Sequence, residues 1–191
     1  MSGSEQIDGF VRDIVSVRDE LSSRIENLSY EQLNWRPNEK RWSAGHVAAH
    51  LCKVAQEYSL AINASAAEAR KEGHTGDGTA AIGLIWKFVL WIMRPPVRLK
   101  MPAPKIFLPL PNQRRKELLK EITKSHDDLI KSLTSAKGLD LKRVRIVSPV
   151  STSFVLTLPR CATFLIAHSE RHLWQIDRLI VENTFPAGRK Q

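Results

Sequence analysis

Cysteine is nearly absent from this sequence. Only Cys52 and Cys161 occur in 191 residues, and they stand far apart without any CxxC spacing. This pattern excludes the disulfide framework of a small secreted domain. Both cysteines fall among apolar helix positions, so we expect them to be small buried side chains.

Long hydrophobic runs are also missing. The longest apolar stretch, residues 80–93, is interrupted by Lys87 and is shorter than the ~20 residues that cross a membrane. The first ten residues contain no basic region followed by an apolar core, which predicts no secretory signal. A cytoplasmic protein is the resulting expectation.

Acidic residues are fewer than basic ones. Lysine and arginine number 29 against 20 aspartate and glutamate, so the net charge is +9. Solubility alone can account for this charge, and the alternatives are an anionic small substrate or a membrane surface. Nucleic acid is not expected as a partner, because no recognition motif accompanies the charge. One basic run contains no acidic residue, which is typical of a solvated loop: Arg94, Arg98, Lys100, Lys105, Arg114, Arg115 and Lys116.

Four segments have apolar residues at spacings of three and four, which predicts amphipathic helices. They cover residues 5–27, 44–72, 113–135 and 159–183. Ser43 and Asn112 are suited to cap the second and third helices, and Pro159 suits the first turn of the fourth. We expect a loop at 29–42 and a short extended piece at 144–147. Together these elements predict an all-α fold, a four-helix bundle that forms one domain along the whole chain.

The connection between the second and third helices, residues 79–111, is long. Its front half is apolar, with Trp86 and Trp91, and its back half contains six prolines that exclude regular helix. An apolar helix does not stay exposed in water, so the front half must cover something. We interpret it as a lid over the open end of the bundle, with a partner subunit or a membrane surface as alternatives. The length also permits the two flanking helices to run in the same direction.

Two pairs of histidines have HxxxH spacing: His46 with His50, and His168 with His172. On a helix, residues four apart have Cβ atoms ~5–6 Å apart, so two imidazoles can grip one metal ion. Either pair alone is equally well explained as two unconnected polar residues. The second pair follows an almost wholly apolar stretch, residues 161–167, and burying imidazoles is costly unless they share a partner. A metal would be such a partner.

Three helical histidines on one ion would leave a coordination position open. Catalytic zinc sites keep such a position, where a water is acidified towards neutrality and a thiol becomes a thiolate. Imidazole ligands suit Zn²⁺, Ni²⁺ or a similar ion. Glu57, seven residues after His50, and Gln175, three after His172, are the candidates to orient a ligand or act as a base. For Glu57 the alternative is an ordinary solvated side chain.

Two stretches of the sequence resemble the signatures of the DinB superfamily. The opening signature is Leu33-Asn34-Trp35-Arg36-Pro37, then Trp42-Ser43-Ala44-Gly45, then His50-Leu51. The closing signature is His168-Ser169-Glu170-Arg171-His172-Leu173-Trp174-Gln175-Ile176. Their order, spacing and loop lengths also match, so the resemblance covers nearly the whole chain.

The resemblance implies a bundle with a three-histidine metal site at one end, and it places the ligands at His50, His168 and His172. Characterised relatives include bacillithiol transferases and mycothiol-dependent maleylpyruvate isomerases, and many others are described only as metal-dependent hydrolases. A low-molecular-weight thiol is therefore a candidate cofactor. His46 departs from the family pattern. As a fourth ligand it would close the site, but we expect it to be no ligand, because the first turn of a helix is frequently solvated.

Taken together, the sequence predicts a metal-dependent hydrolase or thiol S-transferase that acts on a small and anionic molecule. Two alternatives stay open. One is a non-catalytic bundle that keeps the metal as a staple or ligand sensor. The other is a peripheral membrane protein that uses the apolar and basic parts of residues 79–111. A homodimer is also left open.

Overall fold

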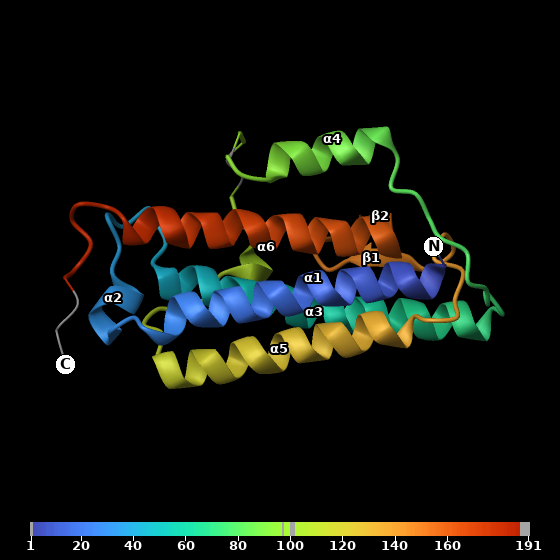
Figure 1. Ribbon diagram of the computed structural model, residues 1–191, viewed down its shortest axis with the longest axis horizontal. Helices are drawn as coiled ribbons and strands as arrows, with labels where there is room; N and C mark the ends of the chain where they lie inside the picture. The colour runs from blue at the N-terminus through green and yellow to red at the C-terminus, as the bar shows by residue number, and fades with distance from the viewer. Residues whose placement is uncertain (1, 97, 100–101, 188–191) are drawn as a thin grey trace.

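The computed structural model describes residues 2–96, 98–99 and 102–187 of the chain. Its four long helices form a bundle, as Figure 1 shows, and this confirms the expected all-α fold class. The four are α1 (Gly3–Glu26), α3 (Ala44–Lys71), α5 (Arg115–Ser135) and α6 (Leu158–Ile180). One small antiparallel sheet accompanies them.

The helices follow an unusual order around the bundle. Helix α5 packs between α1 and α3, and α6 packs against the same two helices on the other side. In Figure 1, α3 and α5 run in one direction while α1 and α6 run in the other. Neighbouring helices with the same direction cannot be joined by a tight turn. The chain between α3 and α5 therefore returns along the length of the bundle, as the long connection permits.

A cap and a first-turn proline explain where two of these helices begin. Ser43 precedes α3, and its Oγ accepts a hydrogen bond from the His46 backbone N–H at 3.1 Å, as expected for an N-cap. Pro159 lies in the first turn of α6, where its missing N–H costs nothing. The Asn112 cap was wrong, because Asn112 has φ of 56° and Arg114 is the residue before α5. The fourth helix also ends at Ile180, three residues before its expected end.

Two small elements lie where the sequence had predicted loop. Helix α2 (Tyr30–Asn34) lies inside the expected loop at 29–42. A hairpin joins β1 (Arg145–Ser148) to β2 (Ser151–Thr157), where only one extended piece was expected. The strands pair antiparallel, with Arg145 opposite Thr157, and β1 packs against α3.

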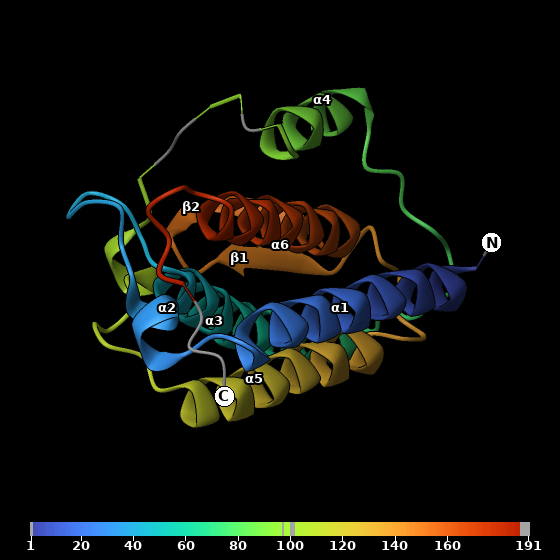
Figure 2. The ribbon, with the colours of Figure 1, turned by 60° about the vertical axis from the view of Figure 1, so that its left-hand side comes forward.

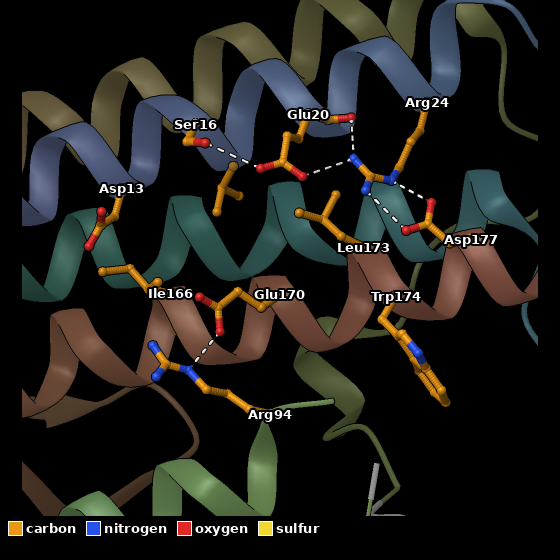
Figure 3. A pocket seen from close by; sticks show the side chains of 11 residues that line it. Asp13, Ser16, Glu20, Arg24, Arg94, Ile166, Glu170, Leu173, Trp174 and Asp177 are labelled. Carbon is orange, nitrogen blue, oxygen red and sulfur yellow. Dashed lines mark hydrogen bonds and ion pairs between the residues drawn. The ribbon is translucent and has the colours of Figure 1, made fainter. Parts of the chain in front are cut away.

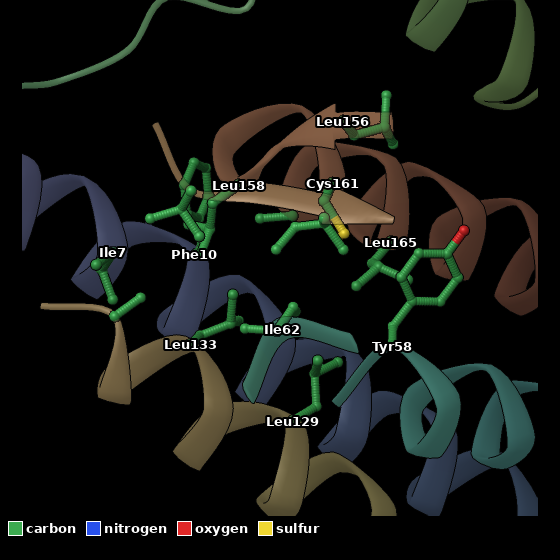
Figure 4. Close-up of a cluster of buried hydrophobic side chains, with 14 of the residues drawn as sticks. Ile7, Phe10, Tyr58, Ile62, Leu129, Leu133, Leu156, Leu158, Cys161 and Leu165 are labelled. Atoms are coloured by element: carbon green, nitrogen blue, oxygen red, sulfur yellow. The ribbon is translucent and has the colours of Figure 1, made fainter. Parts of the chain in front are cut away.

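The buried apolar side chains form two clusters along the bundle. Figure 4 shows the first, in which side chains from all four long helices meet, among them Ile7, Ile62, Leu133 and Leu165. The second cluster lies towards the other end, and its members on α6 begin at Leu173. Helix α6 therefore carries His168 and His172 in the stretch between the two clusters, away from the most uniformly apolar packing.

The connection between α3 and α5 contains α4 (Leu84–Met93) and a short 3₁₀ helix, η1 (Lys105–Phe107). Helix α4 lies on the outer side of α6, apart from the rest of the bundle, as Figure 2 shows. The interpretation of its apolar half as a lid over the bundle's open end was therefore wrong. The proline-rich half instead reaches the bundle through η1. Of the basic run, Lys100 lies outside the described residues.

Whether a helix can cross a membrane depends on its length and its apolar character. Within residues 2–96, 98–99 and 102–187, no helix is both long and apolar enough to cross a bilayer. Helix α4 is apolar but has only ten residues.

Candidate metal centre

Three imidazoles from two helices meet inside the bundle. His50 comes from α3, and His168 and His172 come from α6, where they lie one turn apart. The Nε2 atom of His168 is 3.4 Å from that of His50 and 3.2 Å from that of His172. One nitrogen of each ring lies within 4.8 Å of the others, which makes the three histidines a group that could hold a metal ion.

Hydrogen bonds on the far side of two rings set where their lone pairs point. The Nδ1 of His50 donates to the Phe107 carbonyl at 2.9 Å, and the Nδ1 of His172 donates to the Oε1 of Gln175 at 3.0 Å. A neutral imidazole that carries its proton on Nδ1 has a free lone pair on Nε2. Both rings therefore aim an Nε2 lone pair at His168.

Burial keeps these imidazoles neutral. Removal from water, together with positive charge on His50 and Arg171, lowers the pKa of His172 to about 3. Burial also lowers the pKa of His168 well below its ordinary value and shifts the pKa of His50 in the same direction. Only a neutral imidazole can coordinate a metal, so the three rings are ready as ligands at neutral pH.

Aromatic rings surround the histidines. Trp42 stacks on His172 with centroids 6.3 Å apart, and Phe164 stacks on His168 at 5.7 Å. Phe107 meets His50 edge-on at 6.0 Å and is itself buried. This apolar enclosure limits the access of water and strengthens electrostatic interactions at the histidine nitrogens.

The donor set fits a divalent ion. Ligands 2.0–2.1 Å from a tetrahedral zinc ion lie about 3.3–3.4 Å from one another, and the two Nε2 separations of 3.2 and 3.4 Å agree with that spacing. Both supporting acceptors, Gln175 and the Phe107 carbonyl, are of the kind that orients metal-bound histidines. No carboxylate joins the three imidazoles in the described part of the chain.

The other sequence candidates lie in different places. Gln175 contacts His172 directly and therefore orients a ring. His46 lies against Ser43, with its Nδ1 2.6 Å from the Ser43 Oγ, and it is not part of the three-histidine group. Glu57 is half-buried on α3, and none of the described contacts joins it to the three histidines.

The chain matches the model of the DinB superfamily over residues 13–176. That match covers most of the sequence and includes all three histidines. The chain belongs to the DinB superfamily.

A solved structure shares the fold of this chain. It is YfiT from Bacillus subtilis, described as a probable metal-dependent hydrolase with an unusual four-helix bundle topology. The TM-score is 0.60 at 16% sequence identity, over 92% of this chain and 86% of that one. At this identity the similarity establishes a shared DinB-like fold alone. None of the curated proteins matches the chain.

Sequence reasoning missed two contributors to this DinB histidine group. Trp42 was identified as part of the opening signature but not as a neighbour of the histidines, although it packs against two of them. Phe107 gave no signal, because it lies in a proline-rich segment without periodicity. The cleft of about 430 Å³ in Figure 3 lies between α1 and α6, and none of the three histidines lines it.

Proposed function

We propose that this chain is a metal-dependent enzyme, a hydrolase or a thiol S-transferase that acts on a small molecule, with His50, His168 and His172 as the metal ligands. The convergence of three neutral imidazole nitrogens from α3 and α6 carries the proposal. A bound divalent ion would lower the pKa of a coordinated water or thiol and polarise an oxygen of the substrate. Zn²⁺ and Ni²⁺ are the ions that such ligands favour.

The residues around the histidines have separate tasks. Gln175 and the Phe107 carbonyl hold two rings in the tautomer that leaves Nε2 free. Trp42 and Phe164 pack on the rings and keep bulk water away. Glu57 stays a prediction as a base, and Glu57→Gln should then reduce turnover while leaving the metal content unchanged.

Charge at the site favours an anionic substrate or thiol. Three neutral histidines leave the full charge of a divalent ion uncompensated, because no carboxylate joins the group in the described residues. Arg171 stands next to His172 in the sequence, is half-buried, and forms no ion pair among the described contacts. Its guanidinium would add to the attraction for a carboxylate, a phosphate or a thiolate.

A thiol would have to come from outside the chain. Burial raises the pKa of Cys52 to about 12 and raises the pKa of Cys161 as well, so neither thiol ionises near neutral pH. Both cysteines are buried within the bundle, as expected from their apolar surroundings. A transferase reaction would therefore use a small thiol as its co-substrate.

The first test measures metal directly. Purified protein dialysed against Zn²⁺ or Ni²⁺ should retain close to one equivalent, and His172→Ala should lose most of it. His74→Ala is the matched control, because His74 lies outside the three-histidine group. Equal metal content in the two variants would contradict the ligand assignment.

The second test addresses the reaction. Metal-loaded protein is screened with small thiols against electrophilic acceptors, and in parallel with hydrolysable esters and amides. Product formation that depends on both the metal and His168 would support the proposal.

The position of His46 against Ser43 disfavours a closed four-imidazole site, which was the main argument for a non-catalytic bundle.

A further inference from the structure

Helix α4 exposes an apolar face. Helical geometry brings Leu84, Ile85, Phe88 and Trp91 to one side of α4, and their exposed fractions are 82%, 84%, 60% and 54%. The opposite side is the packed one, where Leu90 is buried. Exposed apolar patches of this kind mark interaction sites on proteins that otherwise hide such side chains.

The helix is held in place with this face outward. On its inner side, the indole N–H of Trp86 donates to the Thr163 hydroxyl of α6 at 3.2 Å. Just beyond its end, Arg94 pairs with Glu170 of α6 at 2.7 Å, as Figure 3 shows. These bonds fasten α4 to α6, and Figure 2 shows that α4 lies apart from the other long helices. The exposed fractions of the four apolar side chains show that the bundle does not cover them.

Positive charge accompanies the exposed face. The sequence contains no aspartate or glutamate between Asp77 and Glu117. Arg98 lies over the Trp91 ring, 3.9 Å from its centroid, and donates to the Trp91 carbonyl at 2.7 Å. Lys87 and Arg98 have no acidic partner among the described residues, so these two cations beside the apolar face are available to an anionic partner.

We propose that α4 docks on an anionic lipid bilayer, with its apolar face in the headgroup boundary and with Lys87 and Arg98 pairing with lipid phosphates. An apolar helix face with tryptophan and a basic rim is typical of interfacial helices. A second copy of the chain fits this face less well, because it would oppose the same cations without any acid in the segment to neutralise them. The proposed docking surface is separate from the metal site, because α4 packs on the outer side of α6 and the three histidines lie between α3 and α6.

Co-sedimentation with vesicles tests the proposal. Wild-type protein should bind phosphatidylcholine vesicles that contain about 30% phosphatidylglycerol at least tenfold more tightly than pure phosphatidylcholine vesicles, and added NaCl should weaken the binding. The double variant Ile85→Glu with Phe88→Glu should lose at least about tenfold in affinity. The matched control is Tyr30→Glu with Leu60→Glu, which adds the same charge at apolar residues that are 61% and 65% exposed elsewhere.

Fluorescence gives a second readout that does not depend on the folding of the double variant. Entry of α4 into the boundary should shift tryptophan emission to the blue, and Trp91→Phe should abolish that shift. Absence of binding to the anionic vesicles, or an equal loss in both double variants, would overturn the proposal. Self-association that is lost in Ile85→Glu with Phe88→Glu, while vesicle binding stays unchanged, would assign the face to a second copy instead.

Discussion

Gln175 and the Phe107 carbonyl occupy the outer nitrogens of two imidazoles, and the ring orientation that a metal ion needs depends on them. Gln175→Leu keeps the size of the side chain but removes the acceptor for the His172 Nδ1 proton. We expect the affinity for Zn²⁺ to fall about 10–100-fold, as measured by competition with a chelating dye. Gln56→Leu is the control, because Gln56 bonds Glu121 of α5 and should leave the affinity unchanged.

A buried histidine outside the metal centre predicts how acid affects folding. His126 of α5 donates from Nδ1 to the Ile122 carbonyl at 2.9 Å, and burial lowers its pKa. The unfolded chain therefore takes up the proton first as the pH falls. The contribution of neutral His126 to the free energy of unfolding is complete above the ordinary histidine pKa of about 6.5. It is lost as the pH drops towards the pKa of His126 in the folded protein.

His126→Asn retains an N–H donor and removes this titration. The free energy of unfolding of the metal-free variant should depend less steeply on pH below 6.5, by up to about 1.4 kcal/mol per pH unit. Urea unfolding between pH 7 and pH 5 in the presence of a chelator measures the slope. Parallel curves for the variant and the wild type would show that His126 is not the residue responsible.

Spacing explains which of the site residues could be predicted. Helical periodicity places His168 and His172 on one side of α6, and the apolar stretch before them indicates burial. The resemblance to a family supplied His50 as the third ligand. Phe107 could not be found in this way, because its carbonyl meets His50 across 57 residues and the chain around it has no pattern.

At the scale of elements, the start of α3 depends on a close approach. A Cβ added at Gly45 would lie 2.9 Å from the Leu33 carbonyl oxygen and 3.0 Å from the Gln113 Cβ. Alanine favours a helix over glycine by about 1 kcal/mol, but here it would push against backbone that cannot rotate away. We expect Gly45→Ala to destabilise the protein by about 1–3 kcal/mol in urea unfolding.

Gly9 offers the matched control for that substitution. It lies within α1, and an added Cβ would meet only the Arg12 guanidinium at 3.9 Å. Gly9→Ala should therefore stabilise the protein by up to about 1 kcal/mol. The same sign for both substitutions would mean that helix propensity, and not the close contact with Leu33 and Gln113, decides the outcome at Gly45.

The four long helices were predictable because each repeats its apolar pattern over many turns. Helix α2 is too short for such a pattern, although Ser29 and Gln32 form a capping box that the sequence displays. The hairpin is also short, and most of β2 is exposed, so it lacks a clear alternation. The position of α4 could not be predicted for another reason. Its apolar composition indicates that the segment packs against something, but it does not indicate which surface of the bundle it packs on.

For the whole molecule, a metal ion bound by His50, His168 and His172 would tie α3 to α6. Binding to the folded state only, at a free concentration a hundred times the dissociation constant, adds about 2.7 kcal/mol. For a chain of this size that corresponds to a rise in Tm of roughly 5–10 °C. Thermal scans with Zn²⁺ and with a chelator should show this difference, and His172→Ala should show none.

Because α3 and α5 are parallel, the connection between them must span the length of the bundle, and it is longer than this span requires. Helix α3, at about 1.5 Å per residue, is about 42 Å long, and an extended chain covers that distance with about 13 residues. Residues 72–114 are roughly three times that number, so routing alone requires neither α4 nor η1. Insertions and deletions could therefore remodel α4 without rerouting the bundle. The stretch around Phe107 is under a stricter constraint, because removing it would leave the outer nitrogen of His50 without its acceptor.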